Sequence, residues 1–266
     1  MQELDLNSLL DKAINASIKA GDEIMKIYDS SFKVETKEDN SPLTIADKNS
    51  NAIIEKALAI SKIPLLSEEG KHIKYSERKE WDYLWIVDPL DGTKEFIKKN
   101  GEFTVNIALV KKQKPILGVI YVPCKNELYY ALEGLGAFKV TIDGSYKGLE
   151  SLLKNSSKLP LNQNRSNYIV VGSRSHMSKE TQNYFDKKKK EYDSVKVLAV
   201  GSSLKICMVA EGKADAYPRY APTMEWDTAA GHAIANMAGF KIIEYNSYNE
   251  ITYNKKELLN PWFLVS

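Results

Sequence analysis

The sequence predicts an α/β fold, an α+β layered sandwich of two subdomains with the functional site in the cleft between them. Three patterns predict it. Apolar residues recur at helical spacing in two early segments, and short apolar strands then follow one another as a meander up to residue 132. Beyond residue 168, short strands alternate with amphipathic helices, which is typical of α/β layering.

The N-terminal part is expected to place two helices on a largely antiparallel sheet. Apolar residues between Leu6 and Tyr28 repeat with helical spacing, and a second helical pattern runs from about Thr44 to Ser61. The expected strands are Ile63–Ser67, Tyr83–Val87, Phe103–Val110, Ile116–Val122 and Leu128–Leu132.

The composition changes between Thr141 and Asn167, where Ser, Asn, Lys and Gly dominate. We interpret 141–167 as a variable connecting segment of loops between an N-terminal metal-binding domain, 1–140, and a C-terminal substrate-binding domain, 168–266. The strands expected after it are Tyr168–Gly172, Val195–Val200, Asp215–Tyr217 and Lys241–Tyr245. The helices expected there are Lys179–Tyr192, Leu204–Glu211 and Asp227–Ala238.

Composition and charge exclude several classes of protein. The 266 residues are 43% hydrophobic and 27% charged, and 37 basic against 35 acidic side chains leave a net charge of +2. A protein that coats nucleic acid carries a larger basic excess, and no apolar run approaches the roughly 20 residues of a membrane-spanning helix. Cys124 and Cys207 are far apart in sequence, which favours a reducing compartment. We expect a cytoplasmic protein, with peripheral contact to the inner membrane as a secondary possibility, that is a monomer or a homodimer.

The most informative motif is an apolar strand that leads directly into Asp88, with Asp91 three residues later. Because Pro89 restricts the backbone, we expect a turn in which both carboxylates converge and the carbonyl of Leu90 lies between them. Carboxylate and carbonyl oxygens suit Mg²⁺. Gly92 allows the backbone to approach a ligand closely, and Thr93 offers a hydroxyl at a helix start. Taken alone, an Asp-Gly pair such as this would be interpreted as an ordinary surface turn.

Two further acidic residues follow other predicted elements. Glu68 comes at the end of the preceding strand, and Asp227 stands at the expected N-cap of a helix. Either one alone could be a solvated acid or a helix cap. Together with Asp88 and Asp91 they would form a cluster of four negative charges, which cations must neutralise. The sequence therefore predicts a site for two Mg²⁺ ions that acts on phosphoryl groups.

These motifs resemble the signature set of the inositol monophosphatase superfamily. Among its members, the longer strings are similar to those of bacterial 3′(2′),5′-bisphosphate nucleotidases. The strings are Leu66–Glu69, Asp88–Phe96, Gly101–Leu109, Gly201–Lys205 and Trp226–Gly231. The resemblance implies the layered fold of inositol monophosphatase and fructose-1,6-bisphosphatase, and a lithium-sensitive phosphatase with two or three Mg²⁺ ions in each active site.

The resemblance also implies roles for individual residues. It assigns metal ligation to Glu68, Asp88, Asp91, Asp227 and the carbonyl of Leu90. It assigns the orientation or deprotonation of a metal-activated water to Asp47 and Thr93. Without the resemblance, Asp47 would be expected to be an exposed helix acid. Substrate contacts are implied for several of these residues and for further positions, namely Glu68, Leu90, Asp91, Gly92, Thr93, Ser173, His176, Gly201, Lys205 and Asp227.

The second half of the chain indicates which phosphate ester is the substrate. Polar turns that lead into helices occur at Ser173 to His176 and at Gly201 to Lys205, and Arg219 lies between tyrosines. Lys205 and Arg219 could hold a second phosphate, which an inositol monophosphatase would not need. Instead of contacting substrate, His176 could cap a helix and Arg219 could form a surface ion pair.

We therefore expect hydrolysis of the 3′-phosphate of adenosine 3′,5′-bisphosphate to AMP and phosphate, and also action on 3′-phosphoadenylyl sulfate. Such a reaction would clear a by-product of sulfur metabolism. The alternatives are an inositol or sugar-phosphate phosphatase, and a non-catalytic nucleotide or cation sensor. The sensor is disfavoured because every expected metal ligand is retained. No partner other than a small-molecule nucleotide is expected.

Overall fold

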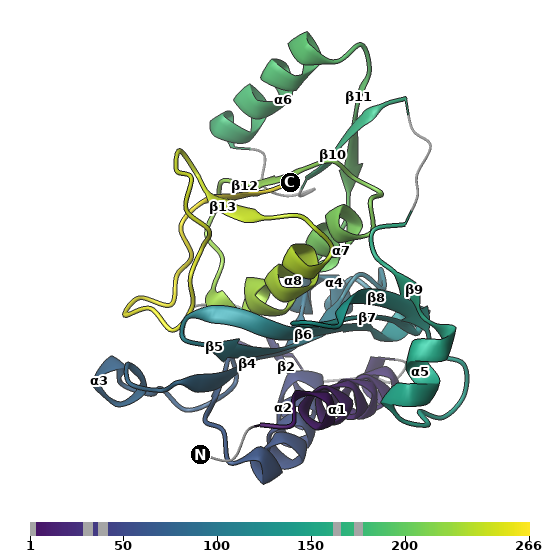
Figure 1. Ribbon diagram of the computed structural model, residues 1–266, viewed down its shortest axis with the longest axis vertical. Coiled ribbons are helices and arrows are strands. Elements are labelled where there is room, and N and C mark those ends of the chain that lie inside the picture. Colours follow the sequence, from purple (N-terminus) through teal and green to yellow (C-terminus); the bar gives the residue numbers. More distant parts are fainter. Residues whose placement is uncertain (1–3, 29–33, 37–41, 162–165, 173–177) are drawn as a thin grey trace.

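A long helix and a seven-stranded sheet form the centre of the computed structural model (Figure 1). The structure describes residues 4–28, 34–36, 42–161, 166–172 and 178–266. Its helices are α1 (Leu6–Tyr28), α2 (Ile45–Leu58), α3 (Tyr75–Arg78), α4 (Thr93–Ile97), α5 (Leu149–Asn155), α6 (Lys179–Glu191), α7 (Leu204–Ala210) and α8 (Glu225–Met237).

The central sheet is largely antiparallel, as predicted, in the strand order β3-β4-β5-β6-β7-β8-β9. Only β3 runs parallel to its neighbour β4. The strands are β3 (Leu65–Ser67), β4 (Tyr83–Asp91), β5 (Thr104–Lys111), β6 (Lys114–Val122), β7 (Glu127–Leu132), β8 (Gly136–Thr141) and β9 (Ser157–Lys158).

Each face of this sheet is covered by helices, which explains why its strands are apolar on both sides. On one face α1 and α2 pack over a core that includes Ile14, Trp85 and Ile107. On the other face α7 and α8 pack over a second core that includes Ile86 and Ile234. Figure 1 shows these layers, with α1 and α2 below the sheet and α8 above it.

Three small sheets complete the fold, two of them beyond α7 and α8. Two parallel strands, β10 (Tyr168–Gly172) and β11 (Val195–Ala199), lie under α6. A three-stranded sheet has the order β12-β14-β13, formed by β12 (Tyr217–Arg219), β13 (Ile242–Glu244) and β14 (Phe263–Val265). Near the N-terminal helices, β1 (Val34–Thr36) pairs with β2 (Pro42–Thr44). Among the described residues, no helix is long and apolar enough to cross a membrane.

The α/β layered fold is confirmed, while several local predictions need correction. The segment 141–167, expected to consist of loops, contains α5 and β9, and β9 adds the seventh strand to the sheet. Its few leucines are sufficient for α5, whose Leu152 is buried. The segment's role as a domain boundary stays a prediction. The strands β8 and β14 were not anticipated.

Candidate active site

A bulge in β4, rather than a turn, brings Asp88 and Asp91 to one face of the sheet. The two residues are three positions apart, so a regular strand would point them to opposite faces. Asp88 pairs with Asn106 and Asp91 with Thr104, which are only two positions apart on β5. The extra residue on β4 is absorbed by a register shift between the two aspartates, so both share the face of Thr104 and Asn106. The predicted convergence is confirmed and the predicted turn is wrong.

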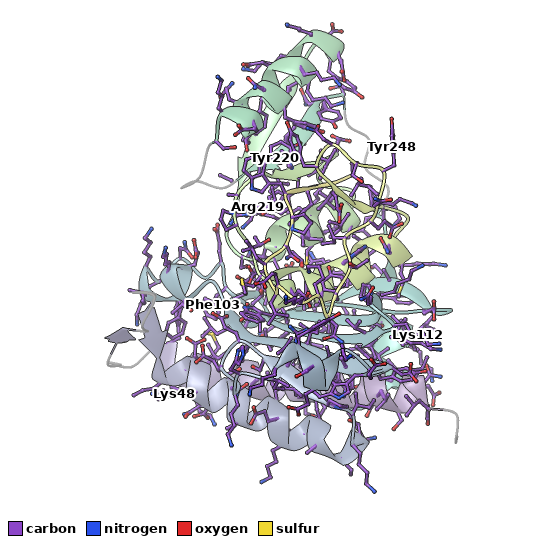
Figure 2. All side chains as sticks on the ribbon, turned by 90° about the vertical axis from the view of Figure 1, so that its left-hand side faces the viewer. Lys48, Phe103, Lys112, Arg219, Tyr220 and Tyr248 are labelled. Carbon is purple, nitrogen blue, oxygen red and sulfur yellow. The ribbon has the colours of Figure 1, made fainter. Side chains whose placement is uncertain are left out.

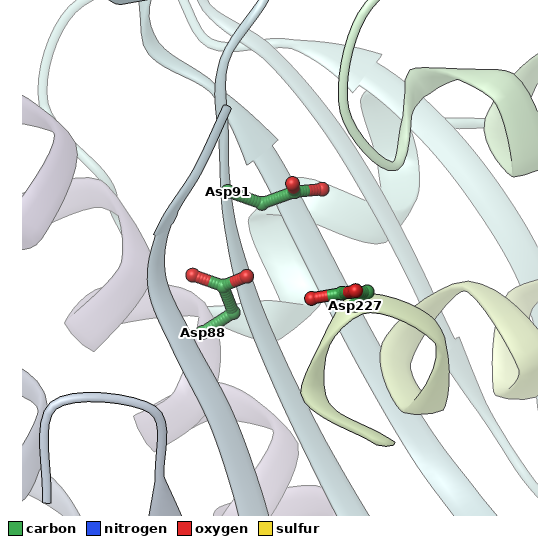
Figure 3. A group of neighbouring side chains, drawn as sticks. All are labelled: Asp88, Asp91 and Asp227. Atoms are coloured by element: carbon green, nitrogen blue, oxygen red, sulfur yellow. The ribbon is translucent and has the colours of Figure 1, made fainter. Parts of the chain in front are cut away.

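Asp227 reaches the same place from α8, as Figure 3 shows. One carboxylate oxygen from each of Asp88, Asp91 and Asp227 lies within 4.8 Å of the others. The expected N-cap role of Asp227 is wrong by three positions, because Met224 is the N-cap residue of the helix. The Asp227 carboxylate instead accepts the backbone N–H of Met224 at 2.8 Å, which fixes its direction at the helix start.

The three carboxylates are crowded, with Asp88 buried and Asp91 and Asp227 partly exposed. Burial, and then the charges of Glu68 and Asp91, raise the pKa of Asp88 well above its usual range. Burial and the charge of Asp91 raise the pKa of Asp227 to about 8. Bringing the three negative charges together is therefore unfavourable, and a bound cation would relieve that repulsion.

Glu68 lies beside this group but is exposed. Its backbone N–H donates to the carbonyl of Val87 at 3.1 Å, so it follows β3 directly alongside the end of β4. The carbonyl of Leu90 accepts the Thr93 hydroxyl at 3.5 Å, which leaves a second lone pair for another partner. The structure thus places both residues next to the aspartates.

Asp47 is buried, so the expectation of an exposed helix acid is wrong. It is 2% exposed in the first turn of α2, and its charge contributes to the raised pKa of Asp88. Thr93 is the first residue of α4, directly after Gly92, whose φ of 97° favours glycine. The helix start predicted at Thr93 is confirmed.

A cavity of about 390 Å³ extends from the aspartates toward the C-terminal half of the chain. Asp91, Gly92, Lys205, Arg219 and Asp227 all line it. In Figure 2, Arg219 and Tyr220 lie well above Phe103, which precedes β5 of the central sheet. The cavity is therefore lined by acidic side chains, Asp91 and Asp227, and by basic ones, Lys205 and Arg219 among them.

Lys205 is the buried cation of this cavity. Its side chain is in the first turn of α7, where its Nζ lies 3.4 Å from the carbonyl of Val200 and 5.8 Å from the centre of the Tyr217 ring. Burial lowers the pKa of Lys205 to about 8. The Arg219 guanidinium donates to the carbonyl of Pro222 at 2.9 Å and makes no ion pair among the described residues.

Gly201 packs tightly beneath this cavity. A Cβ at Gly201 would lie 2.8 Å from the carbonyl oxygen of Glu102, and the Gly201 N–H donates to the Glu102 carboxylate at 2.8 Å. Only glycine fits this approach. Ser173 and His176, also expected to contact substrate, lie outside the described residues.

Sequence reasoning missed the side chains that hold the aspartates. Ser203 donates its backbone N–H and its hydroxyl to Asp91, at 2.6 and 2.7 Å. Asn106 donates to Ser203 at 2.8 Å. A detectable signal was present, because Asn106 interrupts the apolar run of β5, and polar residues in buried strands are usually hydrogen-bonded.

A buried ion pair anchors the start of α8. Glu225 is fully buried and accepts the backbone N–H groups of Asn254 and Lys255, at 2.6 and 2.9 Å, and the Lys255 ammonium at 2.6 Å. The helix turn that carries Asp227 is thereby tied to the segment after residue 253.

The residues present fit Mg²⁺. Three carboxylates from β4 and α8, with a backbone carbonyl and Glu68 beside them, form an all-oxygen donor set, which hard divalent cations prefer. The described part of the chain contributes no histidine or cysteine to this group.

Comparison with known proteins is consistent with this site. The sequence pattern described as the inositol monophosphatase family matches residues 5–261. The chain is 43% identical to 3′(2′),5′-bisphosphate nucleotidase CysQ of Shigella flexneri, over 97% of this chain and 99% of that protein.

Solved structures agree with this comparison. The crystal structure of CysQ from Bacteroides thetaiotaomicron has a TM-score of 0.92 and 51% identity, and the match covers 99% of this chain and 98% of that one. An IMPase/NADP phosphatase complexed with Mg²⁺ and phosphate has a TM-score of 0.74 at 22% identity, over 98% of this chain and 92% of that one. At this identity, the similarity to the second structure shows only that the two proteins share a fold.

Proposed function

This chain belongs to the inositol monophosphatase family, and we propose that it uses its acidic cavity as a 3′(2′),5′-bisphosphate nucleotidase that converts adenosine 3′,5′-bisphosphate to AMP and phosphate. Magnesium dependence and lithium sensitivity are typical of that family. The observation that carries the proposal is that one cavity is lined both by members of the acidic group and by the cations Lys205 and Arg219.

Asp88, Asp91, Asp227, Glu68 and the carbonyl of Leu90 would hold two or three magnesium ions. Bound magnesium supplies positive charge that draws in the phosphoryl oxygens and lowers the pKa of the attacking water. Asp47 and Thr93 lie beside this group, and we assign to them the orientation of that water and the removal of its proton. Gly92 lets the backbone approach the phosphoryl group.

Lys205 and Arg219 would hold the 5′-phosphate in the same cavity. Lys205 is well suited because burial lowers its pKa even with Asp91 nearby, and a bound phosphate would add a negative charge that stabilises the ammonium. The close contact between Gly201 and Glu102 fixes the position of the turn that leads into Lys205. Ser173 and His176 complete the proposed nucleotide contacts.

3′-Phosphoadenylyl sulfate carries the same 3′-phosphate and a phosphate at the 5′ position. We propose this as a second substrate. An inositol monophosphatase is the alternative, and it would not need Lys205 and Arg219 to hold a second phosphate. We further propose a cytoplasmic enzyme, in keeping with the two free cysteines.

The test is phosphate release from adenosine 3′,5′-bisphosphate, AMP and inositol 1-phosphate, with and without MgCl₂. We expect strong preference for the bisphosphate, and a loss of at least about a hundredfold in Asp91→Asn because a ligand oxygen is replaced by an amide. Asp186→Asn, on an exposed turn of α6, is the matched control and should be unchanged.

Two results would count against the proposal. Preference for inositol 1-phosphate would favour the alternative and remove the role assigned to Lys205 and Arg219. No release from any substrate, with Mg²⁺ still bound, would favour a non-catalytic sensor.

A further inference from the structure

A one-way chain of side-chain hydrogen bonds runs from β5 to Asp91. The Thr104 hydroxyl donates to Oδ1 of Asn106 at 2.9 Å, the Asn106 amide donates to the Ser203 hydroxyl at 2.8 Å, and that hydroxyl donates to Oδ2 of Asp91 at 2.7 Å. Thr104 and Asn106 are fully buried and Ser203 is 3% exposed. Because water does not compete at such sites, these bonds hold the side chains firmly.

The orientation of the Asn106 amide fixes the direction of donation. Its nitrogen lies 2.8 Å from the Ser203 oxygen and 3.4 Å from Oδ2 of Asp91. The opposite orientation would place the amide oxygen against the Asp91 carboxylate, which is repulsive. Ser203 therefore accepts from Asn106, and its single proton is directed to the charged Oδ2 of Asp91 at 2.7 Å, the nearer acceptor, while the carbonyl of Asp227 lies 2.9 Å away.

Oδ2 of Asp91 is the oxygen that these bonds use. It accepts the Ser203 N–H at 2.6 Å, the Ser203 hydroxyl at 2.7 Å and the Asn106 amide at 3.4 Å. A carboxylate oxygen has about two lone pairs, so Oδ2 is already occupied. The other oxygen of Asp91 is the one available to a cation.

We propose that Ser203 is a positioning residue for the magnesium site. Its hydroxyl, held by Asn106 and Thr104, orients Asp91 so that only the second carboxylate oxygen is presented to Mg²⁺. Ser203 also contacts the backbone of Asp227, so one residue sets the spacing between ligands from β4 and α8. This inference rests on the proposed function only in taking Asp91 as a magnesium ligand.

The direct test is titration calorimetry of the purified protein with MgCl₂. We expect Ser203→Ala to weaken Mg²⁺ binding about tenfold, the usual effect of removing a hydrogen bond that orients a ligand. Ser17→Ala is the matched control, because Ser17 is equally buried but its hydroxyl bonds only within α1, to Ile14. The control should bind Mg²⁺ as the wild type does.

Steady-state kinetics separate positioning from a general structural defect. In Ser203→Ala the half-saturating Mg²⁺ concentration should rise by the same factor. At saturating Mg²⁺, kcat and the KM for adenosine 3′,5′-bisphosphate should return to about the wild-type values. A folding defect would lower kcat at every Mg²⁺ concentration.

A second variant keeps the inference testable if Ser203→Ala does not fold. Thr104→Val preserves shape and removes the first donor, so Mg²⁺ binding should weaken by about threefold. Because both residues act through one chain, the double variant should bind about as weakly as Ser203→Ala alone.

The inference and the proposed function can fail separately. Wild-type Mg²⁺ affinity in a folded Ser203→Ala or Thr104→Val protein would overturn the inference. A wild-type protein that binds Mg²⁺ but does not hydrolyse the bisphosphate would overturn the function while leaving the calorimetric comparison intact. Absence of Mg²⁺ binding to the wild type would overturn both.

Discussion

Under the proposed function, the choice of substrate depends on Lys205. Lys205 is 9% exposed, and burial lowers its pKa. A bound phosphate would return the favourable interactions that burial removed. A substrate with a second phosphate should therefore gain affinity from this residue, whereas a monophosphate should not.

The residue-scale prediction is that Lys205→Gln raises the KM for adenosine 3′,5′-bisphosphate by roughly ten- to a hundredfold, the worth of a hydrogen bond to a charged group. The KM for adenosine 3′-monophosphate should stay the same. Initial-rate measurements on both substrates check this, with the exposed Lys196→Gln on β11 as control. An equal loss on both substrates would contradict a role in holding the second phosphate.

Some roles of single residues could be predicted from the sequence and others could not. The acidic residues and Lys205 were predicted because their chemistry is visible in short motifs. The hydroxyl of Ser203 was not, because its role depends on Asn106, which is 97 positions away in sequence. Asp47 needed the resemblance, since nothing in a helical pattern tells a buried acid from an exposed one.

At the scale of elements, β4 and α8 set the geometry of the site. The helices were predictable from periodicity, and α1 has the predicted bounds. The bulge in β4 could not be predicted, because it is defined by the register of β4 against β5. Pro89 and the two aspartates were therefore interpreted as a turn.

Helix α8 lies directly on β6 at Gly118, and this contact fixes the height of Asp227 above the sheet. A Cβ at Gly118 would lie 2.3 Å from the carbonyl oxygen of Ala230 and 2.8 Å from the Cβ of Ala233. Gly118→Ala should force the helix away and destabilise the protein by about 1–3 kcal/mol. Activity at limiting Mg²⁺ should fall as well, because Asp227 moves with the helix.

Urea unfolding and activity assays measure both effects. Gly172→Ala on β10 is the control, because a Cβ there meets its nearest neighbour at an ordinary 3.6 Å. If Gly118→Ala had wild-type stability, the contact would not determine the position of α8.

At the scale of the molecule, the site joins parts of the chain that are far apart in sequence. Asp88 and Asp91 come from the central sheet, and Asp227 and Lys205 come from helices on its second face. The layered fold was predictable from the change from a meander to alternating strands and helices. The packing distance between the central sheet and the helices on its second face could not be predicted, because it depends on contacts such as the one at Gly118.

The crowded carboxylates predict an unusual pH dependence for the metal-free protein. The pKa of Asp227 is about 8 in the folded state, against about 3.9 in an unfolded chain. Between these values the folded state binds more protons than the unfolded state, so stability should fall as the pH rises from about 4 to 8. Saturating Mg²⁺ should remove this decline.

Thermal unfolding in EDTA and in MgCl₂ over this pH range measures the effect. The midpoint in EDTA should fall with rising pH, and the increase produced by Mg²⁺ should be largest near pH 8. An Mg²⁺ effect that does not change with pH would show that the three carboxylates are not coupled as described.

We propose that the cavity recognises two phosphates, one at the aspartates and one at Lys205 and Arg219. The decisive measurement is the ratio of kcat/KM for adenosine 3′,5′-bisphosphate to that for adenosine 3′-monophosphate, with Mg²⁺ present. These substrates share the bond that breaks and differ only in the 5′-phosphate. We expect a ratio of about one hundred or more, whereas a ratio near one would show that the cavity does not bind a second phosphate.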